Sequence, residues 1–412
     1  MSQNNLLVSF LGLGIAGKGY ETTKYYLNTP DDFIETKFIV IAICKFYKID
    51  QLIIFTTKSV KESASSPLSE LKEELIKNKI NLLEEEIIPE GKNLLEQKEI
   101  FKKILNVLEK YRNYNFYLDI THGFRSLPLI FFSSLLYLNN IYNYHIEKIF
   151  YGAYEAGDKN KKETPIFDLS YLIELIEWST GVNLFMNRYD SFFLEKLINK
   201  KYKNLNPKSF SSLKSSFKSF SNEFSNVRVT KISEKAKSIL ISLDKLKKEL
   251  EQDAPYLIPM LDKTKEDIDK LTLEDPKILD INQLKFQITL MEKYLEKNLI
   301  LQSVVLLREF IVSLVLFKIN KTDKWDDYEF RQKVIKFIFI NDPFSALNDE
   351  EIEIREAIKE INSIKKKIQH YLNSIKNIRN NFVHAGFGGK EESLDNLSDQ
   401  IKQILKELKK LL

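Results

Sequence analysis

The chain has 412 residues, 43% of them hydrophobic and 29% charged, which is enough for roughly two or three domains with packed cores. Its 12 glycines and 10 prolines are too few for a collagen-like or disordered chain, and its single cysteine, Cys44, excludes an intrachain disulfide and a multi-cysteine zinc site. A formal net charge of +4 provides no strong general attraction for nucleic acid.

The same composition bears on location. No stretch approaches about 18 uncharged apolar residues, and the N-terminus lacks the basic region and cleavage site of a signal peptide. One cysteine suits a reducing compartment, and four histidines argue against a histidine-rich metal site. We therefore expect a cytoplasmic protein with no membrane span and no metal.

The first 170 residues alternate between strand-like and helix-like segments. Short apolar or β-branched runs predict strands near Leu6–Leu13, Gln51–Thr57, Leu82–Ile88, Asn115–Ile120 and Ile146–Tyr151. Helical spacing of apolar residues marks Leu68–Lys79, Leu94–Lys110 and Leu127–Leu138, whereas Thr36–Tyr47 is simply apolar. Strands separated by helices of this length predict βαβ units, and hence a Rossmann-like α/β domain with a mostly parallel sheet.

After about Asp168 the strand signals nearly vanish. Helices are predicted at Leu172–Phe185, Ser209–Ser225, Ile239–Leu250, Leu284–Ile319 and Ile352–Ile378. The serine-rich segment among these reads as a helix because its phenylalanines and leucine recur at steps of three and four. We therefore predict an α/β domain over residues 1–170 and an all-α domain over residues 171–412.

A glycine motif follows the first predicted strand. Gly12, Gly14 and Gly17 match the GxGxxG letters of the dinucleotide-binding fingerprint. The fingerprint also requires an acidic residue at the end of the second strand, but the next clear strand ends in Thr56 and Thr57. A tight structural turn, a site for another phosphate-bearing nucleotide and a nicotinamide site all remain open.

A second motif, Asp119 to Arg125 (DITHGFR), stands where a predicted strand ends and a helix begins. Ligands of open parallel sheets bind beyond the carboxyl ends of the strands. A helix N-terminus together with Arg125 suits an anion, and Thr121 and His122 can hydrogen-bond a base or a ribose hydroxyl. The alternative is a structural turn in which Asp119 acts as a cap.

A third motif, Arg379 to His384 (RNNFVH), lies at the end of a long predicted helix. On its own it is also compatible with a simple helix terminus that carries a favourable cation.

These motifs together carry a family resemblance. The DITHGFR segment, the opening FLGLG at Phe10–Gly14, the Tyr151–Ala153 tripeptide and the Arg-x4-His spacing at Arg379–His384 resemble the CRISPR-associated CARF–HEPN ribonucleases of type III systems. Residues 199–298 carry no part of the resemblance.

The resemblance implies that the N-terminal domain binds a cyclic oligoadenylate, with the tetra-adenylate favoured over the hexa-adenylate, as an allosteric activator. The expected ligand-binding residues are Gly12, Gly14, Thr56, Thr57, Asp119, Thr121, His122, Gly123, Phe124 and Arg125. A two-fold ring calls for a homodimer or a higher even oligomer, because one domain covers only half of it.

The resemblance further implies an endoribonuclease that cleaves single-stranded RNA without a metal or other cofactor. The 2′-hydroxyl would attack the adjacent phosphorus and leave a 2′,3′-cyclic phosphate and a 5′-hydroxyl. Arg379, Asn380 and His384 are the expected catalytic residues. The alternatives are a catalytically inactive CARF sensor that binds a partner, and a nicotinamide-dependent oxidoreductase.

Overall fold

The computed structural model describes residues 4–14, 19–122, 126–205, 208–339, 348–383 and 393–412. Internal contacts divide the chain into two compact units, Met1–Ile176 and Glu177–Leu412, so the division falls inside helix α6 (Tyr171–Arg188). The two units are described separately below.

The first unit is built on an eight-stranded sheet of order β3-β2-β8-β7-β6-β1-β4-β5. The strands are β1 (Asn5–Leu11), β2 (Thr23–Tyr26), β3 (Phe33–Thr36), β4 (Gln51–Thr57), β5 (Asn81–Ile88), β6 (Asn115–Asp119), β7 (His145–Gly152) and β8 (Glu163–Asp168). All neighbours pair in parallel except β7 with β8 and β2 with β3. The predicted Rossmann-like, mostly parallel sheet is confirmed.

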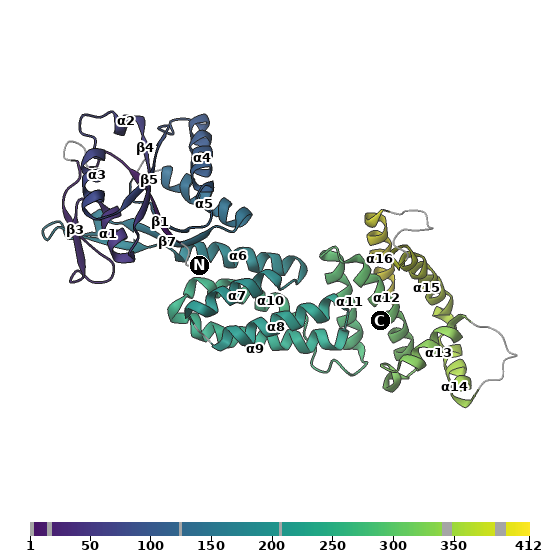
Figure 1. Cartoon of the computed structure of the whole chain (residues 1–412). Helices are drawn as coiled ribbons and strands as arrows, with labels where there is room; N and C mark the ends of the chain where they lie inside the picture. The colour runs from purple at the N-terminus through teal and green to yellow at the C-terminus, as the bar shows by residue number, and fades with distance from the viewer. Residues whose placement is uncertain (1–3, 15–18, 123–125, 206–207, 340–347, 384–392) are drawn as a thin grey trace. The chain divides into compact units, whose positions relative to one another are not determined.

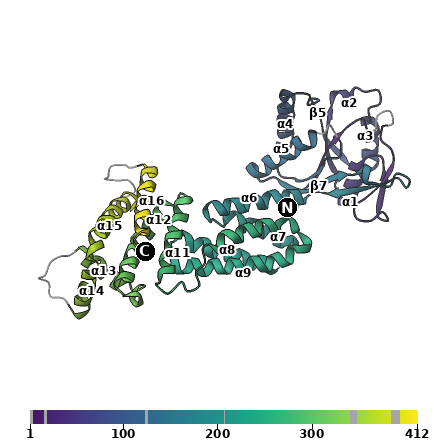
Figure 2. The ribbon, with the colours of Figure 1, turned by 180° about the vertical axis from the view of Figure 1, so that it is seen from behind.

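Helices cover both faces of this sheet (Figures 1 and 2). They are α1 (Ile39–Tyr47), α2 (Lys58–Lys61), α3 (Leu68–Lys77), α4 (Leu94–Glu109) and α5 (Leu127–Tyr142), with a short 3-10 turn η1 (Tyr154–Ala156). Leu6, Val8 and Phe10 of β1 share a core with α4 and α5, whereas Leu7 and Leu11 share the opposite core with α1 and α3. Because both faces are covered, β1 is apolar along nearly its whole length.

The five predicted strands and three predicted helices of this unit are present, and the apolar segment Thr36–Tyr47 forms mainly the helix α1. Strands β2, β3 and β8 were not predicted. They are short, four to six residues, and carry polar or charged residues among the apolar ones, so their alternation is weak.

The second unit is all helical, as predicted. Its helices after α6 are α7 (Phe192–Leu205), α8 (Lys208–Ser225), α9 (Val229–Asp253), η2 (Pro255–Leu257), α10 (Ile258–Asp269), α11 (Ile281–Glu296), α12 (Ile300–Lys318), η3 (Thr322–Lys324), α13 (Tyr328–Phe339), α14 (Asp349–Glu360), α15 (Asn362–Val383) and α16 (Leu394–Lys409). The serine-rich segment is indeed helical, and Phe210, Phe217 and Phe224 of α8 are buried in one continuous core.

Two helices predicted as single pieces are each divided. Leu284–Ile319 contains α11 and α12, which part at Asn298, a residue with φ +56°. Asparagine tolerates this left-handed conformation, and it ends the first helix. Ile352–Ile378 is likewise divided between α14 and α15 near Ile361.

Helix α12 is the centre of the second unit and contacts α11, α13, α15 and α16. It is long and apolar enough to cross a membrane, but two thirds of its most apolar window is buried within the protein. Arg308 and Glu309 interrupt its apolar sequence. These features are those of a core helix.

Candidate functional site

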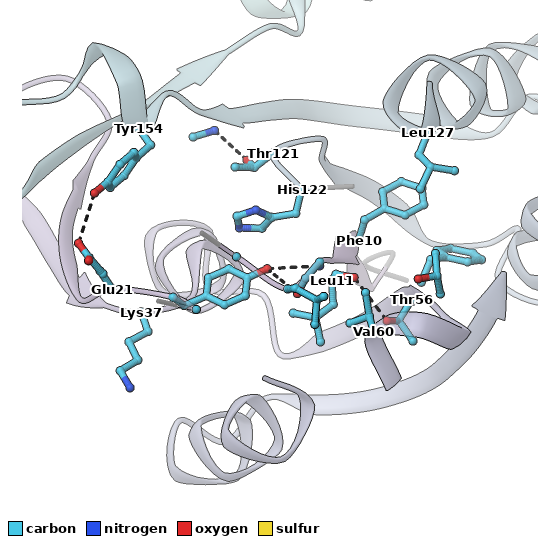
Figure 3. A pocket seen from close by; sticks show the side chains of 18 of the residues that line it. Phe10, Leu11, Glu21, Lys37, Thr56, Val60, Thr121, His122, Leu127 and Tyr154 are labelled. Atoms are coloured by element: carbon cyan, nitrogen blue, oxygen red, sulfur yellow. Dashed lines mark hydrogen bonds between the residues drawn. The ribbon is translucent and has the colours of Figure 1, made fainter. Parts of the chain in front are cut away.

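A cavity of about 460 Å³ lies beyond the carboxyl ends of β1, β4 and β6 (Figure 3). Strand β1 stands between β4 and β6: after β2 and β3, which lie at the far edge beyond β8, the chain crosses to β4 on one side of β1, and it later forms β6 on the other side. This is the switch point at which open parallel sheets bind ligands. We call this space the strand-end cavity.

Six of the predicted ligand-binding residues line the strand-end cavity together. They are Gly12, Gly14, Thr56, Thr57, Thr121 and His122. Gly123, Phe124 and Arg125, which were also predicted, lie outside the described residues. The tripeptide that contributed to the family resemblance is here as well, since Tyr151 and Gly152 line the same cavity.

Asp119 holds a different place from the one expected of a ligand contact. It is fully buried and lies outside the cavity lining. Its carboxylate accepts hydrogen bonds from the Ser9 hydroxyl at 2.6 Å and from the backbone N–H of Thr121 at 3.0 Å, and also from the Thr121 hydroxyl. A buried carboxylate needs such partners because its charge is otherwise costly.

The bonds of Asp119 extend across three strands. Thr121 Oγ1 accepts a hydrogen bond of 2.8 Å from the backbone N–H of Gly152, at the end of β7. Ser9 belongs to β1, and Asp119 ends β6. This network fixes the chain at Thr121, directly before His122, and so determines the shape of one wall of the cavity.

The opposite wall is the turn after β1. Gly14 has φ +78°, and a Cβ atom there would lie 2.5 Å from the carbonyl oxygen of Gly19. Both features require glycine. Gly14 of the glycine motif therefore has a structural reason, whereas Gly17 lies outside the described residues.

Tyr20 connects these two walls and was not predicted as a site residue. Its hydroxyl accepts from the backbone N–H of Gly12 at 3.3 Å and donates to the carbonyl oxygen of the same residue at 3.2 Å. Its ring packs edge to face on His122, with ring centroids 4.9 Å apart. Nothing in its sequence neighbourhood marks it, because the contact depends on the meeting of two distant turns.

His122 projects into the cavity between Tyr154 and Phe10 (Figure 3). Its Nε2 atom is buried and has no hydrogen-bond partner among the described residues. Burial lowers the pKa of His122 below its usual value, although the charge of Asp119 opposes this shift. The imidazole is therefore neutral at pH 7 and has a free nitrogen for a ligand.

Charged residues stand at the rim of the cavity. Glu21 accepts a hydrogen bond from the Tyr154 hydroxyl at 3.4 Å, and Lys37 pairs with Glu70 at 2.5 Å between Nζ and Oε1. Lys37 is the single lysine or arginine in the described lining, which also contains Glu21 and Glu155. Within the described lining, an anion would be held mainly by backbone N–H groups.

The end of β4 bears on the nicotinamide alternative. Where the dinucleotide fingerprint places an acidic residue for the ribose, the cavity presents the hydroxyls of Thr56 and Thr57. Asp31 and Asp32, the nearest acidic residues by sequence distance, are exposed between β2 and β3 and do not line the cavity. The described lining therefore provides no ribose carboxylate at that position.

The third motif occupies the last turn of α15 in the helical unit. Arg379 and Asn380 are half-buried there, and the Nε atom of Arg379 is buried without a hydrogen-bond partner among the described residues. Arg379 also forms no ion pair with a described residue. His384 lies outside the described residues, so the predicted catalytic set is only partly placed.

Comparison with known proteins identifies the N-terminal unit. Residues 6–156 match the family model described as "CRISPR system endoribonuclease Csx1, CARF domain". The CRISPR-associated protein MJ1674 of Methanocaldococcus jannaschii is 23% identical over 456 aligned positions, which cover 97% of this chain and 66% of that protein. The chain thus spans about two thirds of that relative's length.

A solved structure is also similar over nearly the whole chain. It is Enterococcus italicus Csm6 bound to cyclic hexa-2′-fluoro-hexa-dAMP, at 12% identity and a TM-score of 0.47, covering 99% of this chain and 93% of that one.

The parallel sheet with its strand-end cavity and the family match define the first unit as a CARF domain. The whole chain is similar to a CRISPR-associated protein, and its residues 6–156 match the CARF domain model. This part of the family resemblance is confirmed, whereas the assignment of the helical unit as a HEPN nuclease stays a prediction.

Proposed function

We propose that the chain is a cyclic oligoadenylate receptor whose ligand activates an endoribonuclease in its helical unit, as part of antiviral defence. The observation that carries the first half is the strand-end cavity. It combines an open glycine backbone, three threonine hydroxyls and an unpartnered His122 nitrogen inside a CARF domain.

The chemistry of the cavity suits a cyclic oligoadenylate. Each nucleotide offers one phosphate, one 2′-hydroxyl and one adenine. The backbone N–H groups of Leu13 and Gly14 suit the phosphates, whereas that of Gly12 is bonded to Tyr20, and Arg125 adds a cation three positions after His122 in sequence. We propose that Thr56 and Thr57 contact riboses and that neutral His122 contacts a base or a hydroxyl. The Thr121 hydroxyl already donates to Asp119, so it would only accept a hydrogen bond from the ligand.

A two-fold symmetric ring is matched best by two copies of the cavity. We therefore propose that the active form is a homodimer, or a higher even oligomer, with one ring bound by two CARF domains. We favour the tetra-adenylate over the hexa-adenylate as activator.

For the second half of the proposal, the nuclease, the support is the Arg-x4-His spacing and the state of Arg379. A half-buried guanidinium with an unpartnered Nε suits a phosphate, and it can stabilise the charge that develops on phosphorus. His384 would act as general acid or base near neutral pH, and Asn380 would orient either group. Attack by the 2′-hydroxyl then gives a 2′,3′-cyclic phosphate and a 5′-hydroxyl.

The proposed nuclease site is composite. One motif offers one histidine, and acid–base cleavage benefits from a second set of groups, so two copies of the motif would face each other across a dimer. We propose that no metal takes part, since general acid–base groups can move both protons. The cytoplasm, a reducing compartment, is the proposed location.

A second candidate function is a CARF receptor whose helical unit only dimerises or binds a partner. It is favoured by one observation: the Nε atom of Arg379 is buried, which would limit its access to an RNA phosphate. In that case ligand binding would be intact and RNA cleavage absent.

One assay separates the two. Purified protein is incubated with fluorescent single-stranded RNA, with and without cyclic tetra-adenylate or cyclic hexa-adenylate, in buffer with or without EDTA. We expect cleavage that depends on a cyclic activator and is unaffected by EDTA. Ligand binding without cleavage would support the second candidate, a receptor without nuclease activity. Strong inhibition by EDTA would contradict the metal-free mechanism.

A further inference from the structure

Tyr20 is the one described side chain that both hydrogen-bonds the turn after β1 and packs on the ring that follows β6. Its hydroxyl is bonded twice to the backbone of Gly12, and its ring lies against His122 at an interplanar angle of 84°. On another side the ring packs against Phe38, which precedes α1, with centroids 5.2 Å apart. Tyr20 is thus held between three elements.

The hydroxyl of Tyr20 is suited to a fixed structural task. Burial raises the pKa of Tyr20 far above its usual range, so the phenol stays protonated at every physiological pH. A protonated hydroxyl can donate to the Gly12 carbonyl and accept from the Gly12 N–H at the same time. It therefore fixes the backbone at the entrance of the glycine turn.

The ring of Tyr20 acts on His122. The Nε2 atom of His122 has no partner among the described residues, so no described hydrogen bond at that atom sets the orientation of the imidazole. The edge-to-face contact with Tyr20 limits the rotation of the imidazole instead, and aromatic pairs of this geometry are favourable beyond their buried area.

We propose that Tyr20 is a positioning residue of the strand-end cavity: it holds the Gly12 backbone with its hydroxyl and the His122 imidazole with its ring, so that both walls meet a ligand in one arrangement. The proposal rests on the proposed function, because it takes the cyclic oligoadenylate as the ligand. It assigns two separable tasks to one side chain, and two substitutions can separate them.

The test uses the full chain and cyclic tetra-adenylate, with affinity measured by calorimetry. Tyr20→Phe removes only the hydroxyl and should weaken binding by about fivefold, the usual worth of a neutral hydrogen bond. Tyr20→Leu removes the ring as well and should weaken binding by about fiftyfold. Tyr144→Phe is the matched control, since Tyr144 is a buried tyrosine of the same unit whose hydroxyl donates to the carbonyl oxygen of Leu108, outside the cavity lining.

The second readout is the NMR signal of the His122 ring protons in the ligand-free protein. Tyr20→Leu should shift these signals because it removes the ring current, and Tyr20→Phe should leave them nearly unchanged. A double-mutant cycle completes the test: in a His122→Ala background, Tyr20→Leu should cost much less affinity than in the wild type, because its ring task is gone.

The outcomes are distinguishable. If the wild type binds no cyclic oligoadenylate, the proposed function fails, and the ligand role of Tyr20 fails with it. If the wild type binds but both Tyr20 variants bind as tightly as Tyr144→Phe, the proposed receptor function is retained and the positioning role of Tyr20 is overturned. Additive losses in the cycle would contradict the link between Tyr20 and His122.

Discussion

The two regions that carry candidate chemistry differ in how their residues come together. The strand-end cavity gathers groups from Gly12 to His122, more than a hundred residues apart, because parallel strands place their carboxyl ends at one edge. The motif Arg379–His384 is a run of six consecutive residues, and its described part lies at the end of α15. A sheet of this kind assembles a site within one chain, whereas a single helix end presents only one set of groups.

This difference has a chemical consequence. The strand-end cavity offers hydrogen-bond donors and acceptors on several walls, which is what recognition requires. A single arginine and histidine suit phosphate chemistry, but a second acid or base has to come from elsewhere. Under the proposed function, each chain builds one half of the ligand site by itself, whereas the reaction centre would combine groups from two copies.

The largest expected effect concerns the helical motif. Under the proposed mechanism, His384→Ala or Arg379→Ala should lower the RNA cleavage rate by about a hundredfold or more, because each would remove a group that acts on the reacting phosphate. Ligand affinity should not change. His370→Ala is the matched control, since His370 is exposed on the same helix and should retain full activity. A His384→Ala protein that cuts at the wild-type rate would move the chemistry elsewhere.

The next effect concerns the hydrogen-bond network around Asp119. Asp119→Ala should lower the free energy of unfolding by about 3 kcal/mol, because it leaves buried donors of Ser9 and Thr121 without their acceptor. Urea denaturation measures this change, and Asp32→Ala, at an exposed carboxylate, should stay within about 0.5 kcal/mol of the wild type. Equal stability of the two variants would contradict the network.

A smaller effect separates backbone strain from collision at the glycine turn. Gly14→Ala and Gly19→Ala both place a side chain at positive φ, but only the first meets a backbone atom, at 2.5 Å. Gly19→Ala should cost about 1 kcal/mol of stability, and Gly14→Ala should cost more and weaken ligand binding as well. Thermal unfolding measures the loss of stability, and calorimetry measures the ligand affinity. A larger loss of stability in Gly19→Ala than in Gly14→Ala would contradict the close approach of Gly14 to the Gly19 carbonyl oxygen.

The last effect is the pH dependence of stability. Because burial lowers the pKa of His122 in the folded state, the unfolded chain takes up a proton below about pH 6.5 that the folded chain resists. His122 alone therefore makes stability fall with falling pH, by at most about 1.4 kcal/mol per pH unit. His122→Gln should flatten this part of the curve in urea denaturations between pH 7 and 5. An unchanged slope would show that His122 is not buried as described.

The sequence predicted the parts of the fold that have strong periodicity. Long apolar strands such as Gln51–Thr57 and amphipathic helices such as Ser209–Ser225 follow from spacing alone. The short strands β2 and β8 did not, because their pairing depends on partners far away in sequence. Asn298, a single left-handed residue, was enough to divide one predicted helix into two.

The sequence also predicted only part of the candidate site. Residues at strand ends, such as Thr121 and His122, could be placed because the sheet topology brings them to one edge. Tyr20 could not, since its role arises only when the turn after β1 meets the turn after β6. The burial of Asp119 likewise depends on Ser9, which stands 110 positions earlier.

The most direct test of the account is a titration of cyclic tetra-adenylate against RNA cleavage and against binding, for the wild type and for His122→Ala. The account predicts that the wild type is activated saturably, and that the variant needs more ligand for half-activation yet regains most of the cleavage rate at saturation. Selective binding of the ligand to the activating arrangement of the dimer explains both. Full wild-type activity without any ligand would contradict the coupling, and a variant that binds normally but stays inactive would show that His122 transmits the signal instead of holding the ligand.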